Sequence, residues 1–498
     1  MNKFFSYIVA ILAAVAAAAC GPKSVSPDVM SPEAPAMNPD YAGVTFPPNI
    51  AAPSFNIEPD FAAAEFQTEV GRCGQKPEII VRSSEPAVEL PLKKWRGLLG
   101  RSVGDSIYFR ITVRDAGSGK WIGAPDVVCP VSEHEIDGYL VYRQLYPGYE
   151  LWSEMGIYQR SLENYDVTPI LENKDLNNQC INCHNFSAND PSRGMMAHVR
   201  GPQGGTLVSK EGRVEKISSR MEGLDHGATY PSWSRDGRYI AFSANNVIQV
   251  FHTAGTKPIE VVDMGADLIV YDTETHKAYT DATISGQHHL ETFPHWTPDG
   301  SRIYFCRAAG MTDTTRFDTV RYDLYRVDFD RQTGRFFNLQ PVYEASADSM
   351  SVSFPRVSPD GRWLMFTRSR YGNFSIWHPE AQLCLLDLRD GTIREMDEVN
   401  SDNIESYHSW SSDGNWFVFS SKRLDGLTAR PFIASFDSAT GLAGRPFAMP
   451  QESAGFYRLQ TKTYNIPELT VAPVTNQDAL FDGVVGQPAK SVMLIRNH

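Results

Sequence analysis

The sequence contains one closely spaced group of two thiols and an imidazole, Cys180-Ile181-Asn182-Cys183-His184, in a chain with seven cysteines. Two thiols at this spacing can add across the two vinyl groups of one haem, and the adjacent histidine is then held beneath the iron as an axial ligand. The Cys-x-x-Cys-His pattern therefore predicts one covalently attached haem c on Cys180 and Cys183, with His184 bound to the iron.

Three other uses of the same residues remain open. They are a reversible dithiol, one half of a zinc site, and a haem motif that has lost its cofactor and is kept as a disulfide. A structural zinc site needs four ligands, and the sequence has no second Cys-x-x-Cys and no His-x-x-x-His. Zinc is therefore the weakest of the three alternatives.

The N-terminus predicts an exported protein. Lys3 precedes an apolar run, Ile8 to Ala19, and small residues stand directly before Cys20. The pattern resembles a bacterial lipoprotein signal, which implies that residues 1–19 are removed and that Cys20 carries the lipid that binds the membrane. An ordinary secretory signal with an incidental cysteine is the alternative. Export agrees with haem attachment, which in bacteria takes place outside the cytoplasmic membrane.

Composition predicts β structure and sets the first domain boundaries. The net charge is −13, without a basic cluster, which argues against nucleic acid as a partner. Residues 20–59 are rich in proline, alanine and serine, so we expect a disordered tether. Strand-like segments follow within 60–170 and predict a β-sandwich-like domain. Its two cysteines, Cys73 and Cys129, could form a disulfide or remain separately buried thiols.

The second half of the chain repeats one pattern, a strand, an Asp-Gly turn and another strand. The four copies are Tyr230 to Phe242, Phe293 to Phe305, Phe354 to Phe366 and Tyr407 to Phe419, with turns at Asp236, Asp299, Asp360 and Asp413. The spacing between the copies leaves room for two more strands in each repeat. The pattern predicts a β-propeller over 199–498, within an all-β chain.

These copies resemble the TolB-like, WD-related β-propeller repeats. Segments 197–220 and 428–495 have room for two degenerate blades, so we expect six blades, while five and seven remain open. Together with the lipoprotein signal and the Cys-x-x-Cys-His motif, the chain is similar to an exported family of TolB-like lipoproteins of Bacteroides-like bacteria. That resemblance implies a cell-envelope location, which we expect to be the outer membrane facing the periplasm, and a protein partner on a propeller face.

The haem motif falls in the expected joint between the two domains, residues 171–198. The joint is too short for the helices of an ordinary small cytochrome c. A haem would therefore lie between the sandwich and the propeller, and its iron would take a sixth ligand from Met195, Met196 or His198, or leave that position open. Each of the three also has a simpler explanation, because methionines fill apolar gaps and single histidines often lie at surfaces.

Alignment of the four repeats on their turns predicts a polar channel mouth. One column holds a hydroxyl in every copy, three residues ahead of the column of Ser232, His295, Arg356 and Ser409, and two copies add a carboxylate just before it. The residues are Thr229, Glu291, Thr292, Ser353, Glu405 and Ser406. They predict a mildly anionic funnel that could hold waters, a cation or a basic group of a partner. The alternative is that the hydroxyls bond to neighbouring backbone.

Two functions therefore compete, and both need little more than these features. One is electron transfer or haem-based sensing; the other is a non-catalytic interaction scaffold with a vestigial haem motif. A hydrolase ranks last, because it would need a Gly-x-Ser-x-Gly elbow followed by an acid and a histidine, and we expect no such elbow.

Overall fold

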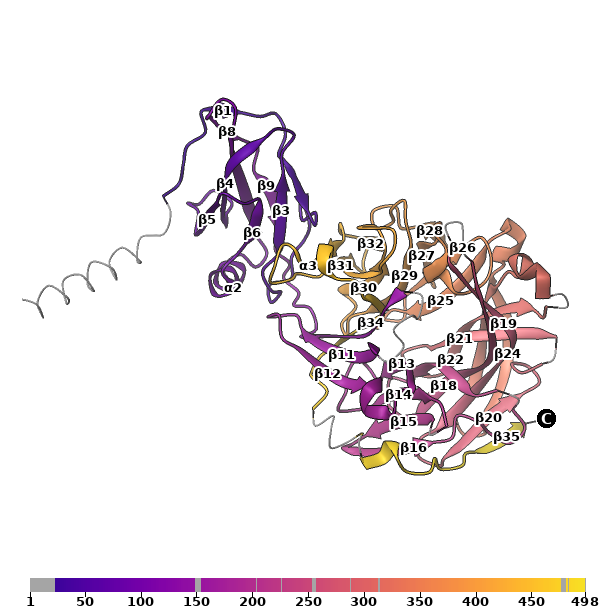
Figure 1. Cartoon of the computed structure of the whole chain (residues 1–498). Coiled ribbons are helices and arrows are strands. Elements are labelled where there is room, and N and C mark those ends of the chain that lie inside the picture. Colours follow the sequence, from indigo (N-terminus) through magenta and orange to yellow (C-terminus); the bar gives the residue numbers. More distant parts are fainter. Residues whose placement is uncertain are drawn as a thin grey trace, which may run out of the picture. The chain divides into compact units, whose positions relative to one another are not determined.

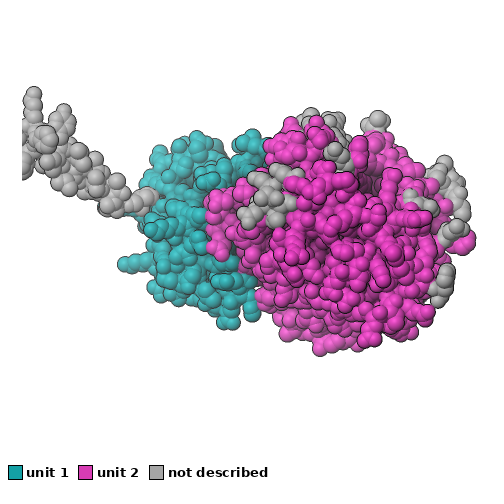
Figure 2. Space-filling model, turned by 90° about the horizontal axis from the view of Figure 1, so that it is seen from below, with its two compact units in different colours: residues 1–135, 450–460 teal, residues 136–449, 461–498 magenta. Residues whose placement is uncertain are grey.

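The computed structural model describes residues 23–147, 154–202, 204–224, 226–252, 257–286, 288–311, 314–475, 481 and 483–497 (Figure 1). The predicted signal and Cys20 lie outside this part of the chain. Two compact units are formed, Met1–Glu135 with Pro450–Gln460, and Ile136–Met449 with Thr461–His498 (Figure 2). Among the described residues, no helix is long and apolar enough to cross a membrane.

The first unit contains two β-sheets and a helix. The larger sheet has the order β1-β8-β7-β4-β5, with β9 also paired to β7, and the smaller one has the order β2-β3-β6. Their bounds are β1 Val29–Met30, β2 Ala36–Asn38, β3 Ser54–Glu58, β4 Ala63–Arg72, β5 Ile79–Ser83, β6 Ala87–Glu89, helix α2 Leu92–Gly100, β7 Ser106–Asp115, β8 Trp121–Gly123 and β9 Val127–Pro130. Phe55 of one sheet packs edge-on against Phe109 of the other, with ring centroids 6.0 Å apart. This is the predicted sandwich-like arrangement.

The structure differs from the predicted disordered tether, residues 20–59, because much of this segment is folded into the first unit. Tyr41, Val44 and Phe46 are buried in the first unit, and β2 and β3 are made from residues within 36–58. Phe46 packs edge-on against Trp95 at 5.2 Å. Proline-rich composition suggested disorder, but aromatic residues spaced along the segment supply enough apolar surface to bury it. Cys73 and Cys129 are both free thiols.

The chain does contain one Gly-x-Ser-x-Gly sequence, Gly100 to Gly104, which corrects the expectation that none occurs. It follows the helix α2 instead of joining a strand to a helix, as a nucleophile elbow must. Ser102 is fully buried and donates a hydrogen bond to the Leu98 carbonyl at 2.8 Å. The segment is the C-terminal end of a helix, and its serine is not presented as a nucleophile.

The second unit is built from sets of antiparallel strands that run from an inner to an outer strand. The sets are β34-β10-β11-β12 (Thr463–Thr470, Tyr139–Leu145, Gly156–Ser161, Val167–Glu172), β13 to β16 (Cys180–Phe186, Met195–Arg200, Gly205–Lys210, Arg213–Ile217), β17 to β20 (Ala228–Trp233, Tyr239–Phe251, Ile259–Asp272, Lys277–Asp281), β21 to β24 (His289–Trp296, Arg302–Ala309, Asp323–Asp330, Arg335–Tyr343), β25 to β28 (Ser351–Val357, Trp363–Ser369, Gln382–Asp387, Ile393–Glu395) and β29 to β33 (Glu405–Trp410, Trp416–Ser421, Arg430–Asp437, Leu442–Ala443, Phe447–Ala448). The C-terminal strand β35, Met493–Asn497, pairs with β20.

The inner strands form a closed ring. Strand β13 contacts β17, and the contacts continue through β21, β25, β29 and β34 back to β13. Within the described residues the second unit is therefore a β-propeller with six inner strands, and the all-β prediction is confirmed. Each Asp-Gly turn has its glycine at positive φ, as at Gly237, where φ is 78°.

The division between the two units differs from the predicted one. Strands β10 to β12, which we expected in the sandwich, pair with β34 from near the end of the sequence and complete a propeller blade. The haem motif lies in β13, an inner propeller strand, and not in a joint between domains. Apolar alternation identifies a strand but not its partner, so a pairing between segments more than 300 residues apart was not visible in the sequence.

Candidate functional site: the propeller channel

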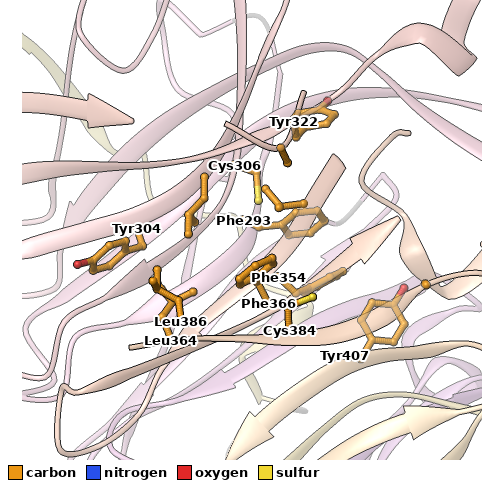
Figure 3. Close-up of a cluster of buried hydrophobic side chains, with 14 of the residues drawn as sticks. Phe293, Tyr304, Cys306, Tyr322, Phe354, Leu364, Phe366, Cys384, Leu386 and Tyr407 are labelled. Carbon is orange, nitrogen blue, oxygen red and sulfur yellow. The ribbon is translucent and has the colours of Figure 1, made fainter. Parts of the chain in front are cut away.

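The middle of the propeller channel is filled by a ring of large side chains. Successive inner strands each present one residue, and the ring centroids are close, at 4.6 Å for Tyr230 and Phe293, 4.1 Å for Phe293 and Phe354, and 4.7 Å for Phe354 and Tyr407. Figure 3 shows Phe293, Phe354 and Tyr407 within a buried cluster. These four residues and Ile466 have positive φ, between 46° and 53°. Such angles are uncommon for residues other than glycine, so the backbone is locally strained to direct these side chains inward.

The strain lies in a β-bulge that the repeat strands share. In β17, for example, the pairing register with β18 shifts between Thr229 and Ser232, so two residues oppose one. The same shift occurs in β21, β25 and β29. A bulge bends its strand and redirects the side chains that follow it.

The haem motif is a sixth copy of the channel-lining segment. A cavity at the aromatic ring is lined by Cys183, His184, Tyr230, Pro231, Phe293, Pro294, Phe354, Arg356 and Ile466. Cys183-His184 thus stands where the repeats have Tyr230-Pro231 or Tyr407-His408. Hydrogen bonds support this equivalence. The Trp233 backbone N–H donates to Asn185 Oδ1 at 2.7 Å, and at the same position in another pair of blades the Val357 N–H donates to His295 Nδ1 at 3.1 Å.

The predicted cofactor residues are buried together in β13. Cys180 and Cys183 are free thiols, and burial raises the pKa of the Cys183 thiol. His184 is 2% exposed, and neither of its ring nitrogens has a hydrogen bond, although the backbone of Val141 and Ile466 is close. Burial first, and then the charge of Arg143, lowers the pKa of His184 to about 3, so the imidazole is neutral.

The candidates for a sixth iron ligand lie elsewhere on β14. Met195 packs in one apolar cluster with Ile181, and Met196 packs in a different one with Trp233. His198 is buried, and its Nδ1 lies 3.1 Å from Thr206 Oγ1. None of the three lines the cavity that contains Cys183 and His184.

The haem donors are present, but the space for a porphyrin is not. Two free thiols and a neutral, unpartnered imidazole are the groups that haem c requires. The cavity beside Cys183 and His184 measures about 20 Å³, and the one beside Cys180 about 70 Å³. Pockets for ligands smaller than a haem already span about 300–1,000 Å³. In this conformation the residues around the motif therefore do not fit the group. No cluster of three or more His, Cys, Asp or Glu suited to a metal ion occurs among the described residues.

The predicted funnel residues lie inside the blades. Thr229 donates to the Ser243 carbonyl at 3.1 Å, and Asn245 donates to Thr292 Oγ1 at 3.3 Å. Ser353 and Ser406 both bond to the Ser375 hydroxyl, at 3.0 and 2.6 Å. None of these hydroxyls lines any of the described cavities, because the bulge that follows them presents later residues to the channel.

Each of the two predicted carboxylates lies beside an arginine of its own blade, although burial raises the pKa of both and takes that of Glu291 to about 8. Glu291 lies 3.1 Å from Arg307 Nε, and Glu405 lies 2.8 Å from Arg423 Nη2. Glu405 also accepts a hydrogen bond from the Ser401 hydroxyl at 2.7 Å. These contacts indicate a structural role for both carboxylates.

The polar residues that do line the channel form what we call the polar ring, one from each inner strand. Its members are Asn185, Ser232, His295, Arg356, Ser409 and Glu468, and the cavity they line measures about 100 Å³. Sequence alignment had placed four of them in one column without assigning them a role. The other two members, Asn185 and Glu468, lie in the short segments Cys183 to Phe186 and Ile466 to Leu469, which correspond to the repeats. Neither segment is followed by the Asp-Gly turn that identified the repeats, so neither was recognised in the sequence.

The charges of the polar ring are only loosely paired. The Arg356 guanidinium has one described hydrogen bond, from Nη1 to the Pro355 carbonyl at 3.3 Å, and no carboxylate within ion-pair distance among the described residues. Glu468 accepts a hydrogen bond from Asn185 Nδ2 at 2.8 Å. Burial raises the pKa of Glu468 to about 7, although the charge of Arg356 opposes the shift. At neutral pH the ring therefore carries a positive charge that is not fully balanced.

Comparisons with known proteins add little to this picture. No protein-family model matches the chain. An uncharacterised protein of Agrobacterium fabrum is 26% identical over 171 residues, which are 30% of this chain and 53% of that protein, so the chain spans about half the length of this curated relative. Among solved structures, tricorn protease aligns over 70% of this chain and 34% of its own length, at 12% sequence identity and a TM-score of 0.36. A DUF4784 family protein from Bacteroides caccae aligns over 85% of this chain and 97% of its own length, at 10% sequence identity and a TM-score of 0.28.

Proposed function

We propose that this chain is a β-propeller binding protein of the cell envelope, lipid-anchored through Cys20, which captures a partner at the polar ring and performs no reaction itself. The observation that carries the proposal is the Arg356 guanidinium, which lines a cavity and has no carboxylate within ion-pair distance among the described residues. A charge removed from water without a counter-ion is costly, and such groups are common where a ligand or partner supplies the missing contact.

The composition of the mouth supports a polar ligand group on the partner. Beside the ring lies Arg235, which donates to the Ser412 carbonyl at 3.3 Å and adds a second positive charge at the rim. The remaining ring members offer hydroxyl, amide and imidazole groups, together with the carboxyl of Glu468, whose pKa burial raises to about 7. A side chain or chain end of a partner that carries a carboxylate would satisfy Arg356 and exclude water from the cavity.

Photo-crosslinking tests this assignment. A photoreactive residue at Ala188, on the rim of the cavity, should capture one discrete partner in the envelope of the source organism. The same residue at Thr392, an exposed position on an outer strand end, is the matched control. Arg356→Gln should abolish the crosslink from Ala188 while the protein stays folded. An equal crosslink from both positions, or one insensitive to Arg356→Gln, would overturn the proposal.

The membrane anchor has its own test. Cys20→Ser should leave an exported protein that no longer partitions with membranes, because the two acyl chains of a lipoprotein anchor suffice for stable attachment and one weak signal does not. Retention of the variant in the membrane fraction would exclude lipid on Cys20 as the anchor.

Haem attachment is the second candidate function, and the unpartnered ring nitrogens of His184 beside two free thiols favour it. Attached haem would support electron transfer or sensing, and it would need more space than the cavities of about 20 and 70 Å³ beside the motif provide. Protein made in cells with haem-attachment machinery should then retain peroxidase-active haem in a denaturing gel. Cys180→Ala and Cys183→Ala should remove it, and Cys306→Ala, a buried thiol outside the motif, should not. Wild-type protein without haem would eliminate this candidate.

A further inference from the structure

Among the described residues, the second mouth of the channel, beside Cys180, is lined by two arginines and by no Asp or Glu. Its polar lining includes Arg143, Cys180, Asn182 and Arg200. This cavity shares no lining residue with the cavity of the polar ring.

Arg143 is nearly inaccessible to water and poorly satisfied. It is 5% exposed, and its Nε has no hydrogen-bond partner. Its contacts are Nη1 to Asn182 Oδ1 at 3.3 Å, Nη2 to Met155 Sδ at 3.5 Å and Nη2 to Cys180 Sγ at 3.9 Å. Amide and sulfur atoms are weak partners for a charged guanidinium. Among the described residues, no carboxylate pairs with it.

Arg200 stands directly across from the motif. It is the pairing partner of Cys180 in the β13–β14 ladder, and it is half-buried. Within the described part of the chain, its side chain makes no hydrogen bond or ion pair. The two arginines therefore lie on either side of Cys180 and share a cavity in which their positive charges are not balanced.

The rest of the lining is apolar and aromatic. Tyr230, Phe374 and Tyr407 line the cavity, and Val247 and Val261 come from the long hairpin of β18 and β19. The site thus combines a cationic end with an apolar wall.

We propose that Arg143 and Arg200 bind the carboxylate of a small organic acid whose apolar body lies against these aromatic side chains. A carboxylate can accept two parallel hydrogen bonds from one guanidinium, and a second arginine at the same cavity adds charge. The cavity of about 70 Å³, open at its mouth, admits the carboxylate end and part of the body. This site goes beyond the proposed function, since it lies at the other mouth and involves different residues.

Two alkylating reagents test the site through the thiol that lies inside it. Iodoacetate carries a carboxylate and iodoacetamide does not. With either, the Cys180 sulfur forms a bond to the CH₂ carbon as iodide leaves and the thiol proton passes to solvent. Cys73, a partly exposed thiol in the first unit that lies near Asp105 and Asp126, is the internal control. We expect the ratio of iodoacetate to iodoacetamide rates, measured by mass spectrometry, to be about tenfold higher at Cys180 than at Cys73.

Variants separate this site from general charge effects. Arg200→Gln should remove most of the tenfold preference, and Arg213→Gln, an exposed arginine on β16 of the same blade, should leave it unchanged. Equal ratios at Cys180 and Cys73, or an equal loss in both variants, would overturn the proposal.

A second measurement does not depend on thiol accessibility. Benzoate should raise the unfolding temperature of the wild-type protein with a saturable dose response, and Arg200→Gln should weaken its apparent affinity by about tenfold or more. Benzyl alcohol, the uncharged counterpart, should have no such effect. Stabilisation by inorganic phosphate that matches benzoate would show that the site binds charge alone and would overturn the role of the aromatic wall. No stabilisation by benzoate would overturn the site. Neither result depends on the crosslink from Ala188.

Discussion

Two columns of polar residues, three positions apart on the same inner strands, have different environments. The hydroxyls and carboxylates of the first column, such as Thr229 and Glu405, are buried and bonded within their blades. The second column, represented by Ser232 and Arg356, lines the channel cavity with fewer partners. Equally polar residues can therefore be structural or available for binding, and the bulge between them decides which. The predictions below test this contrast, from the largest expected effect to the smallest.

The largest effect is expected for Glu405→Gln in the first column. Glu405 is fully buried and pairs with Arg423, which is 19% exposed, so the substitution leaves a buried guanidinium without its counter-ion. We expect the free energy of unfolding to fall by about 3–5 kcal/mol. Urea denaturation measures the change. Glu395→Gln, which breaks the more exposed pair with Arg368, is the control and should cost less than about 1 kcal/mol. Similar losses would mean that burial does not distinguish the two pairs.

Glu468→Gln in the polar ring should act in the opposite direction and depend on pH. The folded-state pKa of about 7 is above the unfolded value of 4.5, so the stability that Glu468 contributes is present below pH 4.5 and is lost as pH rises through 7. The variant lacks this loss. At pH 8 it should be more stable than wild type by up to roughly 3 kcal/mol, relative to their difference at pH 4.5.

The groups that face Glu468 are Arg356, Asn185 and the neutral His295, whose pKa burial holds well below its ordinary value. Denaturation curves at pH 4.5, 6, 7 and 8 follow the divergence, and Glu395→Gln should show none. A difference that is constant with pH would contradict the raised pKa of Glu468.

The two histidines at the same repeat position give a smaller contrast. His408 Nε2 lies 3.0 Å from the Met365 carbonyl, whereas the ring nitrogens of His184 lie near the backbone of Val141 and Ile466 without a hydrogen bond of normal geometry. Both substitutions to alanine leave a cavity, but only His408→Ala also removes a hydrogen bond. We expect it to cost about 1 kcal/mol more than His184→Ala in urea denaturation. A larger loss for His184→Ala would indicate a packing role that its missing hydrogen bonds do not reveal.

The smallest contrast compares both columns within one strand. Thr229→Val keeps the shape of the side chain but removes a buried hydrogen bond to Ser243, so it should cost about 1 kcal/mol. Among the described residues, Ser232 Oγ accepts one long hydrogen bond, 3.4 Å from the Trp296 N–H, so Ser232→Ala should cost less than about 0.5 kcal/mol. A larger stability loss for Ser232→Ala than for Thr229→Val would mean that the column lining the channel has the structural role.

Much of the fold followed from local pattern, and much of the site did not. The four Asp-Gly turns and their flanking strands were predicted because turn chemistry and alternation are local. The pairing of β34 with β10 was not, because backbone hydrogen bonds between distant strands leave no mark on either sequence. The polar ring was missed because a bulge at residues such as Tyr230 and Phe293 directs its side chains into the channel. Tyrosine and phenylalanine rarely adopt positive φ, so the sequence does not indicate the bulge. The Cys-x-x-Cys-His motif was identified by its chemistry, while its position as a propeller repeat was masked by the replacement of an aromatic residue with Cys183.

The late position of β34 has a consequence for biogenesis. Strands β10 to β12 are synthesised early, but the edge they present stays unpaired until Thr463–Thr470 has been synthesised. The first unit is also incomplete until late in synthesis, because Ser54 and Asn56 donate hydrogen bonds to the carbonyls of Gln451 and Ala454. Contacts this distant in the chain slow folding, and an open strand edge invites pairing with other chains. We therefore expect a chain that lacks β34 to aggregate instead of forming a smaller propeller.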